Sequence, residues 1–456
     1  MPMDHIERAL ASNRADYCEI RLERRITTRI IYHGRRLETV STVVNEGGIV
    51  RALSSDGGWG MSTFNSLDDL TTRVEQAHAS ARLVPRREIH LASHPVIVDV
   101  APASPALDGE GITLEQQHDL ANRYNGILLG YPQIVDTQAA YIDQHITLTY
   151  ANSEGTRIIE ERPMAMVSLS ATARDGTNVQ RAGDGTSSAD GYPAMLQLDD
   201  LARRVATRAT DLLSAQTVVG GVYPVICDPR LAGVFVHEAF GHLSEADFVY
   251  ANPQARDMMV LGRRFGRENL NIIDDGSLPG QRGTLRYDDE GTPPQRTPLV
   301  ERGILVGRLH SRETAAAMGE APTGNARATD FRFPPIVRMT NTYIEPQDAS
   351  FEEMIADIDL GVYACDAIGG QTMLETFSFS AGHGYMIRQG QLAEMVRDVV
   401  LAGNLFSTLA NIDAIGSDLA FSRSGSCGKG QGGGLPVGIG APHIRIQDVA
   451  MGGRQA

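Results

Sequence analysis

Alternating apolar and polar positions in the first half of the chain predict β-hairpins interleaved with helices. Residues 18–40 alternate around a turn at His33-Gly34, which predicts one hairpin. Residues 49–55 and 57–64, separated at Asp56-Gly57, predict a second hairpin. Strands are expected again from Ile134 to about residue 190, with a turn at 152–155.

Apolar residues at helical spacing predict four helices in the same half. These are expected over 4–12, over 67–83, from Thr113 onward and over 198–215. Pro85 is expected to close the region of the second helix, and the Pro-, Ala- and Gly-rich stretch 98–112 to cross the surface.

The second half is richer in glycine and in β-like runs. It shows one clear early helix, followed by strand-like segments at 283–294, 299–309, 336–345, 376–392 and 433–448. The predicted fold class is α+β, with an N-terminal α+β domain of hairpins and helices and a mostly antiparallel, sheet-rich C-terminal domain. Gly220-Gly221 is the expected boundary, which gives domains 1–219 and 220–456.

Length and charge narrow the class of protein. A chain of 456 residues exceeds one ordinary core, so two or three domains are expected. With 41 Lys+Arg against 56 Asp+Glu, the net charge of -15 argues against direct nucleic-acid binding. The chain shows no signal-peptide pattern, no apolar run long enough to span a membrane, and four scattered cysteines without a CxxC pair. These features predict a soluble cytoplasmic protein, not bound to a membrane, without a disulfide scaffold.

Residues 223–242 carry the clearest chemical pattern, a buried strand followed by a helix with HExxxH. Asp228 suits the N-cap, Pro229 the first helical position, and His237, Glu238 and His242 follow. Histidines five apart lie ~140° apart around a regular helix, too far to share a metal. A π-bulge, or a helix that ends and bends near Gly241, would bring them together. The alternative is two unrelated histidines that happen to flank a glutamate.

Two histidines do not complete a zinc site, which usually has three protein ligands. The spacing leaves the third ligand open among Glu245, Asp247, His310, His383, Cys365 and Cys427. Glu245 follows His242 by three residues, and Cys427 lies among glycines that permit close backbone approach. His383 is more simply read as a structural histidine, and Cys18, Cys227 and Cys365 as packing residues.

Several long motifs occur together and in a fixed order. They are HEAFGHLSEAD from His237, IIDDGS at 272–277, Asp289-Glu290-Gly291, TGNAR at 323–327, RMTNTYI at 338–344 and CGKGQGGGLPVGIG at 427–440. With these motifs the sequence resembles the TldD/PmbA family of metallopeptidases, once described as modulators of DNA gyrase. The resemblance covers nearly the whole chain.

The resemblance implies zinc held by His237, His242 and Cys427, with Glu238 as the catalytic glutamate. It also implies an N-terminal α+β domain, a sheet-rich catalytic domain and a protease for unfolded or short peptides that works as a homodimer or with a related chain. Some family members lack HExxxH, and this chain is not of that type. Asn325, Arg327, Arg338 and Asn341 lie in the motifs and are read as structural.

The predicted chemistry is metal-assisted peptide hydrolysis, in which Glu238 activates the water. Glu245 and Asp247 either orient a ligand histidine or form a solvated acidic helix end. Lys429, the single lysine, either meets a substrate carboxylate or oxyanion or remains solvated. The glycine-rich strands near 434–440 are expected to accept a substrate as an added β-strand. The competing hypotheses are a non-catalytic regulator of gyrase or of a related chain, and a hydrolase of non-peptide amides.

Overall fold

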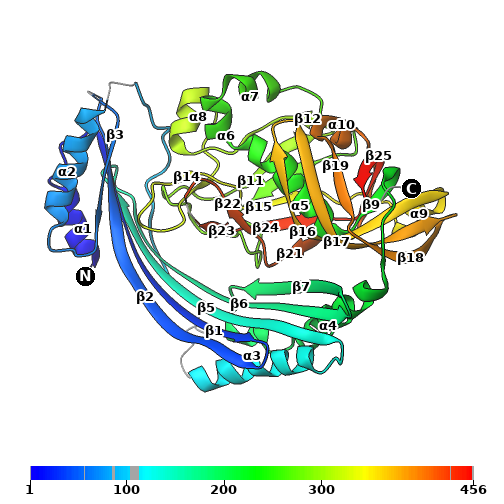
Figure 1. Ribbon diagram of the computed structural model, residues 1–456. Helices are drawn as coiled ribbons and strands as arrows, with labels where there is room; N and C mark the ends of the chain where they lie inside the picture. Colours follow the sequence, from blue (N-terminus) through cyan, green and yellow to red (C-terminus); the bar gives the residue numbers. More distant parts are fainter. Residues whose placement is uncertain (1, 56, 85–87, 103–111, 432, 454–456) are drawn as a thin grey trace.

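The N-terminal half is built on one long, curved sheet (Figure 1). The computed structural model describes residues 2–55, 57–84, 88–102, 112–431 and 433–453. The strand order is β3-β2-β1-β5-β6-β4, with β7 also paired to β6. The strands are β1 (Tyr17–His33), β2 (Arg36–Leu53), β3 (Trp59–Phe64), β4 (Val98–Ala101), β5 (Ile134–Asn152), β6 (Arg157–Asp175) and β7 (Asn178–Ser188).

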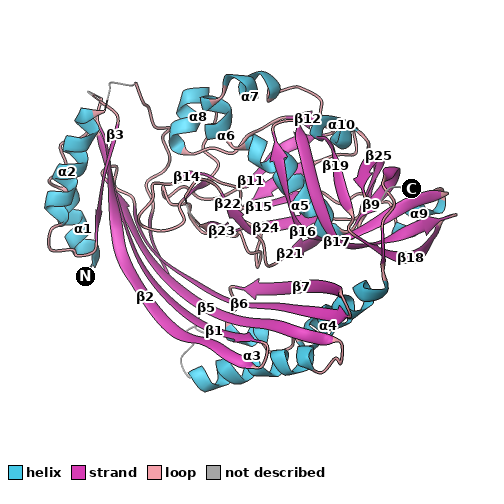
Figure 2. Ribbon diagram, in the orientation of Figure 1, coloured by secondary structure: helices cyan, strands magenta, loops and turns pink. Residues whose placement is uncertain are grey.

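Four helices cover the apolar, convex face of this sheet. They are α1 (Pro2–Leu10), α2 (Leu70–Leu83), α3 (Leu114–Leu129) and α4 (Asp199–Ser214), with a 3₁₀ turn η2 (Tyr192–Met195) before α4. Figure 2 shows α1 and α2 at one end of the sheet and α3 and α4 beneath the other. Thr113 begins α3 with a capping box to Gln116. Both predicted hairpins and all four predicted helices are confirmed.

The C-terminal half lies on the concave side of the curved sheet and contains two larger sheets (Figure 1). One has the order β12-β11-β10-β15-β24-β21, the other β16-β9-β25-β19-β17-β18-β8, with β20 added on β25. Their strands are β8 (Gln216–Thr217), β9 (Gly221–Cys227), β10 (Ile272–Asp275), β11 (Arg296–Glu301), β12 (Ile304–Leu305), β15 (Asn341–Ile344), β16 (Leu360–Met373), β17 (Thr376–Arg388), β18 (Gln391–Arg397), β19 (Val400–Asn404), β20 (Ile412–Ile415), β21 (Ala420–Ser422), β24 (Gly438–Ala441) and β25 (Ile444–Gly452). Most pairings are antiparallel, so the α+β class is confirmed.

Two small ribbons and several short helices complete this half. The ribbons pair β13 (Ala326–Arg327) with β14 (Ile336–Val337), and β22 (Ser426–Gly428) with β23 (Gly434–Pro436). The helices are α5 (Pro229–Val236), α6 (Ala246–Ala251), α7 (Pro253–Met258), α8 (Arg312–Met318), α9 (Phe351–Ala356) and α10 (Leu405–Ala410). Among the described residues, no helix combines the length and the hydropathy needed to cross a bilayer.

Residues 98–101, in the stretch expected to cross the surface, form the largely exposed edge strand β4, parallel to β6. Two other expectations about local structure were wrong. Residues 283–294 form no strand, because the Asp288 carboxylate accepts backbone N–H groups from Glu290, Thr292 and Ala326 and folds the segment into a loop. The described part of the second half has five further helices after α5, each too short to show a clear periodicity. Asp56, Pro85 and residues 103–111 of the predicted surface stretch lie outside the described residues.

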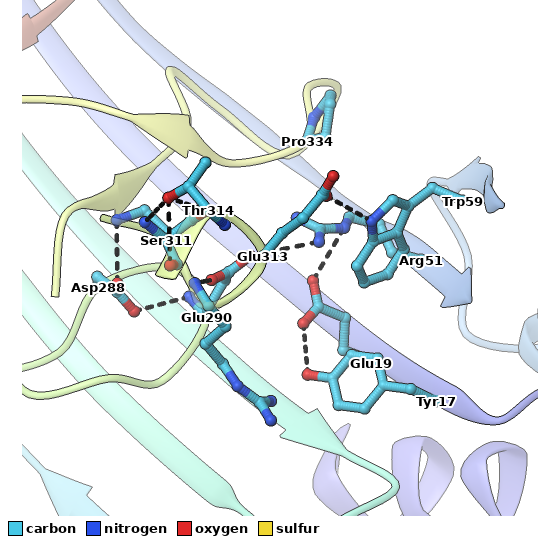
Figure 3. A network of polar contacts seen from close by, with 12 residues as sticks. Tyr17, Glu19, Arg51, Trp59, Asp288, Glu290, Ser311, Glu313, Thr314 and Pro334 are labelled. Carbon is cyan, nitrogen blue, oxygen red and sulfur yellow. Dashed lines mark hydrogen bonds and ion pairs between the residues drawn. The ribbon is translucent and has the colours of Figure 1, made fainter. Parts of the chain in front are cut away.

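The polar face of β1 is buried against the acidic loop at 288–290, not exposed to water. Glu19, Arg21 and Arg51 are all less than a tenth exposed. Arg51 lies 3.1 Å from Glu19 and 3.4 Å from Glu290, while Glu19 accepts a hydrogen bond from Tyr17 (Figure 3). These contacts join the two halves of the chain through paired buried charges.

Asp289 lies at the centre of this interface, and Asp289→Asn is expected to destabilise the protein. Its carboxylate is 3.1 Å from Arg21 and 3.5 Å from Arg162. Burial favours a higher pKa for Asp289, but the two arginines outweigh it and hold the pKa below its usual value. Removing one partner of such a buried pair costs about 3–5 kcal/mol.

The destabilisation should depend on pH in a defined direction. Because the folded pKa of Asp289 is lowered, its carboxylate stabilises the fold above the unfolded-state pKa of about 4 and loses that effect as the pH falls further. Denaturant unfolding from pH 7 to pH 3 should therefore show a difference between wild type and Asp289→Asn that shrinks below about pH 4. The exposed Asp69→Asn is the control, and a difference independent of pH would contradict the assignment.

Candidate metal centre

The HExxxH segment is a helix that changes its hydrogen-bonding period at the first histidine. Asp228 caps α5 by accepting the Leu231 N–H at 2.8 Å, and Pro229 occupies the first turn. A π-helical turn η3 (His237–Gly241) follows, then a 3₁₀ turn η4 (His242–Ser244). The His242 N–H donates to the His237 carbonyl, five residues back, which is the π-helical bond. Of the two distortions that the sequence left open, the π-bulge is the one that forms, and the two imidazole rings lie 5.4 Å apart.

Gly241 permits this distortion by its lack of a side chain rather than by an unusual backbone angle. Its φ of -57° is ordinary helix. A Cβ at this position would lie 2.1 Å from the Met339 sulfur, which is itself buried. The π-turn therefore packs directly against Met339, in the segment between β14 and β15.

The structure brings Cys427 to the two histidines. Each of His237, His242 and Cys427 offers one ligand atom, and these atoms all lie within 4.8 Å of one another. Cys427 lies on β22, and its Sγ is 3.2 Å from His242 Nε2. The sequence left this third ligand open, because 185 residues separate Cys427 from His242.

The donor set fits a soft or borderline cation such as zinc. Both ring nitrogens of His237 are buried and lack a hydrogen-bond partner among the described residues, which leaves a lone pair free for a metal. Burial raises the pKa of the Cys427 thiol, but the adjacent imidazoles outweigh it and lower the pKa to about 6. Two imidazoles and a thiolate match zinc's preferences.

His242 is held from both sides. Its Nε2 faces Cys427, and its Nδ1 lies 3.0 Å from Glu245 Oε2. Burial lowers the pKa of His242, yet hydrogen bonds to Cys427 and Glu245 raise it to about 10. The carboxylate of Glu245 is fully buried, and its contact with Nδ1 orients the ring, one of the two roles expected for it.

Glu238 points a partly exposed carboxylate toward the same group. Its side chain is 31% exposed, and its Oε2 lies 3.8 Å from His242 Nε2. The carboxylate therefore borders the ligand cluster while remaining open to water, as a proton-transfer group requires.

The other sequence candidates lie elsewhere or contact the centre indirectly. His310 binds Thr314 and Glu320, and His383 lies 3.5 Å from Asp366, opposite Cys365 on β16. Asp247 and Lys429 pair with each other at 2.7 Å. Arg338, read as structural, donates to the Cys427 carbonyl.

Sequence reasoning missed Gln431, which binds the segment 329–334 beside the cysteine loop. The available signal was its position: between Cys427 and Leu435 only residues 429 and 431 are not glycine.

Family models match almost the whole chain. They describe the PmbA/TldA metallopeptidase domain 1 at residues 18–81, the central domain at 108–213 and the C-terminal domain at 220–453. The chain belongs to the TldD/PmbA family of metallopeptidases. Its resemblance to this family is thus confirmed, and the chain is a protease of the metal-dependent class.

Relatives of the TldD/PmbA family align along nearly their full length. A metalloprotease of Synechocystis sp. is 45% identical over 97% of this chain and 96% of its own. A zinc metalloprotease TldD homolog of Saccharolobus solfataricus is 30% identical over 96% and 97%. The fold is that of a candidate modulator of a DNA gyrase from Thermotoga maritima, with a TM-score of 0.81, 20% identity and 99% and 100% coverage. TldE from Thermococcus kodakarensis shares it, with a TM-score of 0.77, 19% identity and the same coverage.

Proposed function

We propose that this chain is a zinc-dependent peptidase that cleaves unfolded or short peptides, with Glu238 as the general base. The observation that carries the proposal is the convergence of His237, His242 and Cys427, with unpartnered nitrogens on His237 and a thiol whose pKa is lowered. These three residues would hold the metal. Zinc, when bound, supplies Lewis acidity that polarises a carbonyl and lowers the pKa of water.

The chain's own residues supply the proton transfers. The Glu238 carboxylate is positioned at the edge of the ligand cluster to take a proton from the attacking water and pass it to the leaving amine. A thiolate ligand leaves the centre less electrophilic than an all-histidine set, so a well-placed base contributes more. Glu245 keeps His242 in the orientation that presents Nε2 to the cluster.

The ribbon that carries Cys427 offers a place for an extended substrate. Among the glycine-rich strands at 434–441, β24 pairs with β15 on one edge and β21 on the other, so it has no room for a further strand. In contrast, β22 and β23 pair only with each other within the described residues. A peptide added to this ribbon would be bound through its backbone, which favours unfolded segments over particular side chains. Because the Cys427 carbonyl already accepts from Arg338, the peptide would pair beyond that residue.

Proteolysis of unfolded substrate with and without chelator tests this function. The protein should degrade unfolded casein, lose that activity on dialysis against a chelator, and regain it on addition of zinc. Activity is measured by the release of acid-soluble peptides. Folded proteins, offered in place of casein, are the control for specificity. Full activity in metal-free protein would contradict a metal-dependent mechanism. Binding of casein without its cleavage would favour a regulatory role.

A further inference from the structure

The loop that carries the thiolate is almost devoid of side chains. Residues 428–434 read GKGQGGG, and Gly430 has a φ of +65°, in the left-handed region. A glycine-rich loop has many accessible conformations, and ordering it costs conformational entropy. Besides the β22–β23 pairing and the Arg338 bond to the Cys427 carbonyl, the side chains that can anchor this loop are those of Lys429 and Gln431.

Lys429 ties the loop to the end of the histidine helix. Its ammonium has three N–H donors, and three acceptors of the chain surround it. They are Glu245 Oε2 at 3.0 Å, Asp247 Oδ1 at 2.7 Å and the Val337 carbonyl at 3.1 Å. Because Glu245 Oε2 also lies 3.0 Å from His242 Nδ1, one carboxylate connects the loop to a ligand histidine.

Gln431 ties the loop to a segment on the opposite side. Its side chain is buried, its Oε1 accepts the Thr329 N–H at 3.2 Å, and its Nε2 donates to the Pro334 carbonyl at 2.7 Å. The Thr329 hydroxyl also donates to the Gln431 carbonyl. The oxygen and the nitrogen of the side-chain amide are thus both hydrogen-bonded to segment 329–334.

Segment 329–334 is in turn held by the N-terminal sheet. On β1, Arg25 donates to the Thr329 carbonyl at 3.0 Å, and Arg21 donates to the carbonyls of Asp330 and Phe333 at 2.7 and 3.2 Å. The Phe331 ring packs on Gly47 of β2, where a Cβ would lie 2.4 Å from the ring. A continuous set of contacts therefore runs from β1 to the cysteine loop.

We propose that Lys429 and Gln431 are positioning residues for the thiolate of Cys427, and that the N-terminal sheet acts on the metal centre through Gln431. This inference rests on the proposed function. With all three Lys429 donors used inside the chain, its ammonium is not free for a substrate carboxylate or oxyanion. Loss of either anchor frees the glycine loop, and outer partners of metal ligands typically change metal affinity by ~10–100-fold.

Cobalt binding tests the proposal without relying on turnover. Cobalt(II) bound by a thiolate gives a charge-transfer absorption, which reports directly on Cys427. Lys429→Met and Gln431→Met should each weaken cobalt binding by ~10-fold or more and reduce that band. Lys429→Arg should restore part of the affinity and part of the band. Arg25→Met should change both in the same direction as Gln431→Met. The matched control is Arg332→Met, because Arg332 lies in the same segment, is 67% exposed and contacts its neighbours Asp330 and Phe333 rather than the cysteine loop.

The outcomes separate this inference from the proposed function. Wild-type affinity and a full band in both Lys429→Met and Gln431→Met would overturn the anchoring role. A wild-type protein without any thiolate band would instead remove Cys427 from the ligand set. Should Gln431→Met not fold, Arg25→Met decides, since the Arg25 side chain is a quarter exposed and contacts no proposed ligand. Unchanged cobalt affinity there would overturn the link to the N-terminal sheet.

Discussion

Glu238→Gln is expected to lose turnover while retaining its metal. The amide keeps the shape of the carboxylate but cannot accept a proton from water, so the proton transfers assigned to Glu238 cease. General acid–base catalysis of this kind contributes about 10²–10⁴-fold, and kcat should fall by that factor. Because the side chain is partly exposed and is not among the three converging ligand residues, stability and zinc content should remain those of the wild type. Steady-state kinetics on unfolded casein and metal analysis of the same preparation measure both.

A matched control and the zinc content distinguish proton transfer from other roles of Glu238. Glu352→Gln makes the same chemical change on an exposed glutamate of α9 and should leave kcat unaltered. Normal peptidase activity in Glu238→Gln would refute the general-base assignment. Zinc lost together with activity would instead show that Glu238 helps to bind the metal.

Local rules were sufficient for the helix that bears the histidines. Asp228 and Pro229 are a standard N-terminal cap, and the five-residue spacing of His237 and His242 fits one period of a π-turn. The sequence narrowed the distortion to a π-bulge or a bend near Gly241, because both histidines, and the bond between their backbones, lie within six residues.

Contacts between distant segments lay beyond the same reasoning. Alternation along β1 predicted a strand, but not that Glu19, Arg21 and Glu23 would be buried on its polar face. Their partners include Asp289, which is more than 260 residues away in the sequence, so no local pattern marks them. Burial of that face follows only when the second half of the chain docks on the concave side of the sheet.

The third ligand illustrates the same limit within the site. Glu245 follows His242 closely and was an equal candidate from spacing alone, whereas Cys427 reaches the site only through the fold of β22 and β23. In the structure Glu245 binds His242 and Lys429, and Cys427 faces the histidines. Family resemblance, not spacing, indicated Cys427.

Cys427→Ser should therefore nearly abolish metal binding. A hydroxyl does not ionise at neutral pH as this thiol does. The substitution therefore removes one of the three metal ligands, not a residue that merely orients a ligand. Zinc affinity should fall by more than ~100-fold, the largest loss usual for mutation of a residue that only holds a ligand. Peptidase activity should fall with it. Metal content after dialysis and competition titration with a chromophoric chelator measure the loss. Cys365→Ser, at a buried thiol on β16 whose pKa is raised by burial, is the matched control and should keep its zinc.

Unchanged zinc content in Cys427→Ser would move the third ligand elsewhere, and Glu245 is the first residue to examine. Its Oε2 lies 3.0 Å from His242 Nδ1, closer to a ring nitrogen of the cluster than Glu238 Oε2 at 3.8 Å. Glu245→Gln then discriminates between the two arrangements. If Cys427 is the ligand, Glu245→Gln weakens zinc binding only by the ~10–100-fold expected for an orienting partner, and a thiolate signature persists in the cobalt protein. If Glu245 is the ligand, the same substitution removes the metal, and the cobalt protein shows no thiolate band.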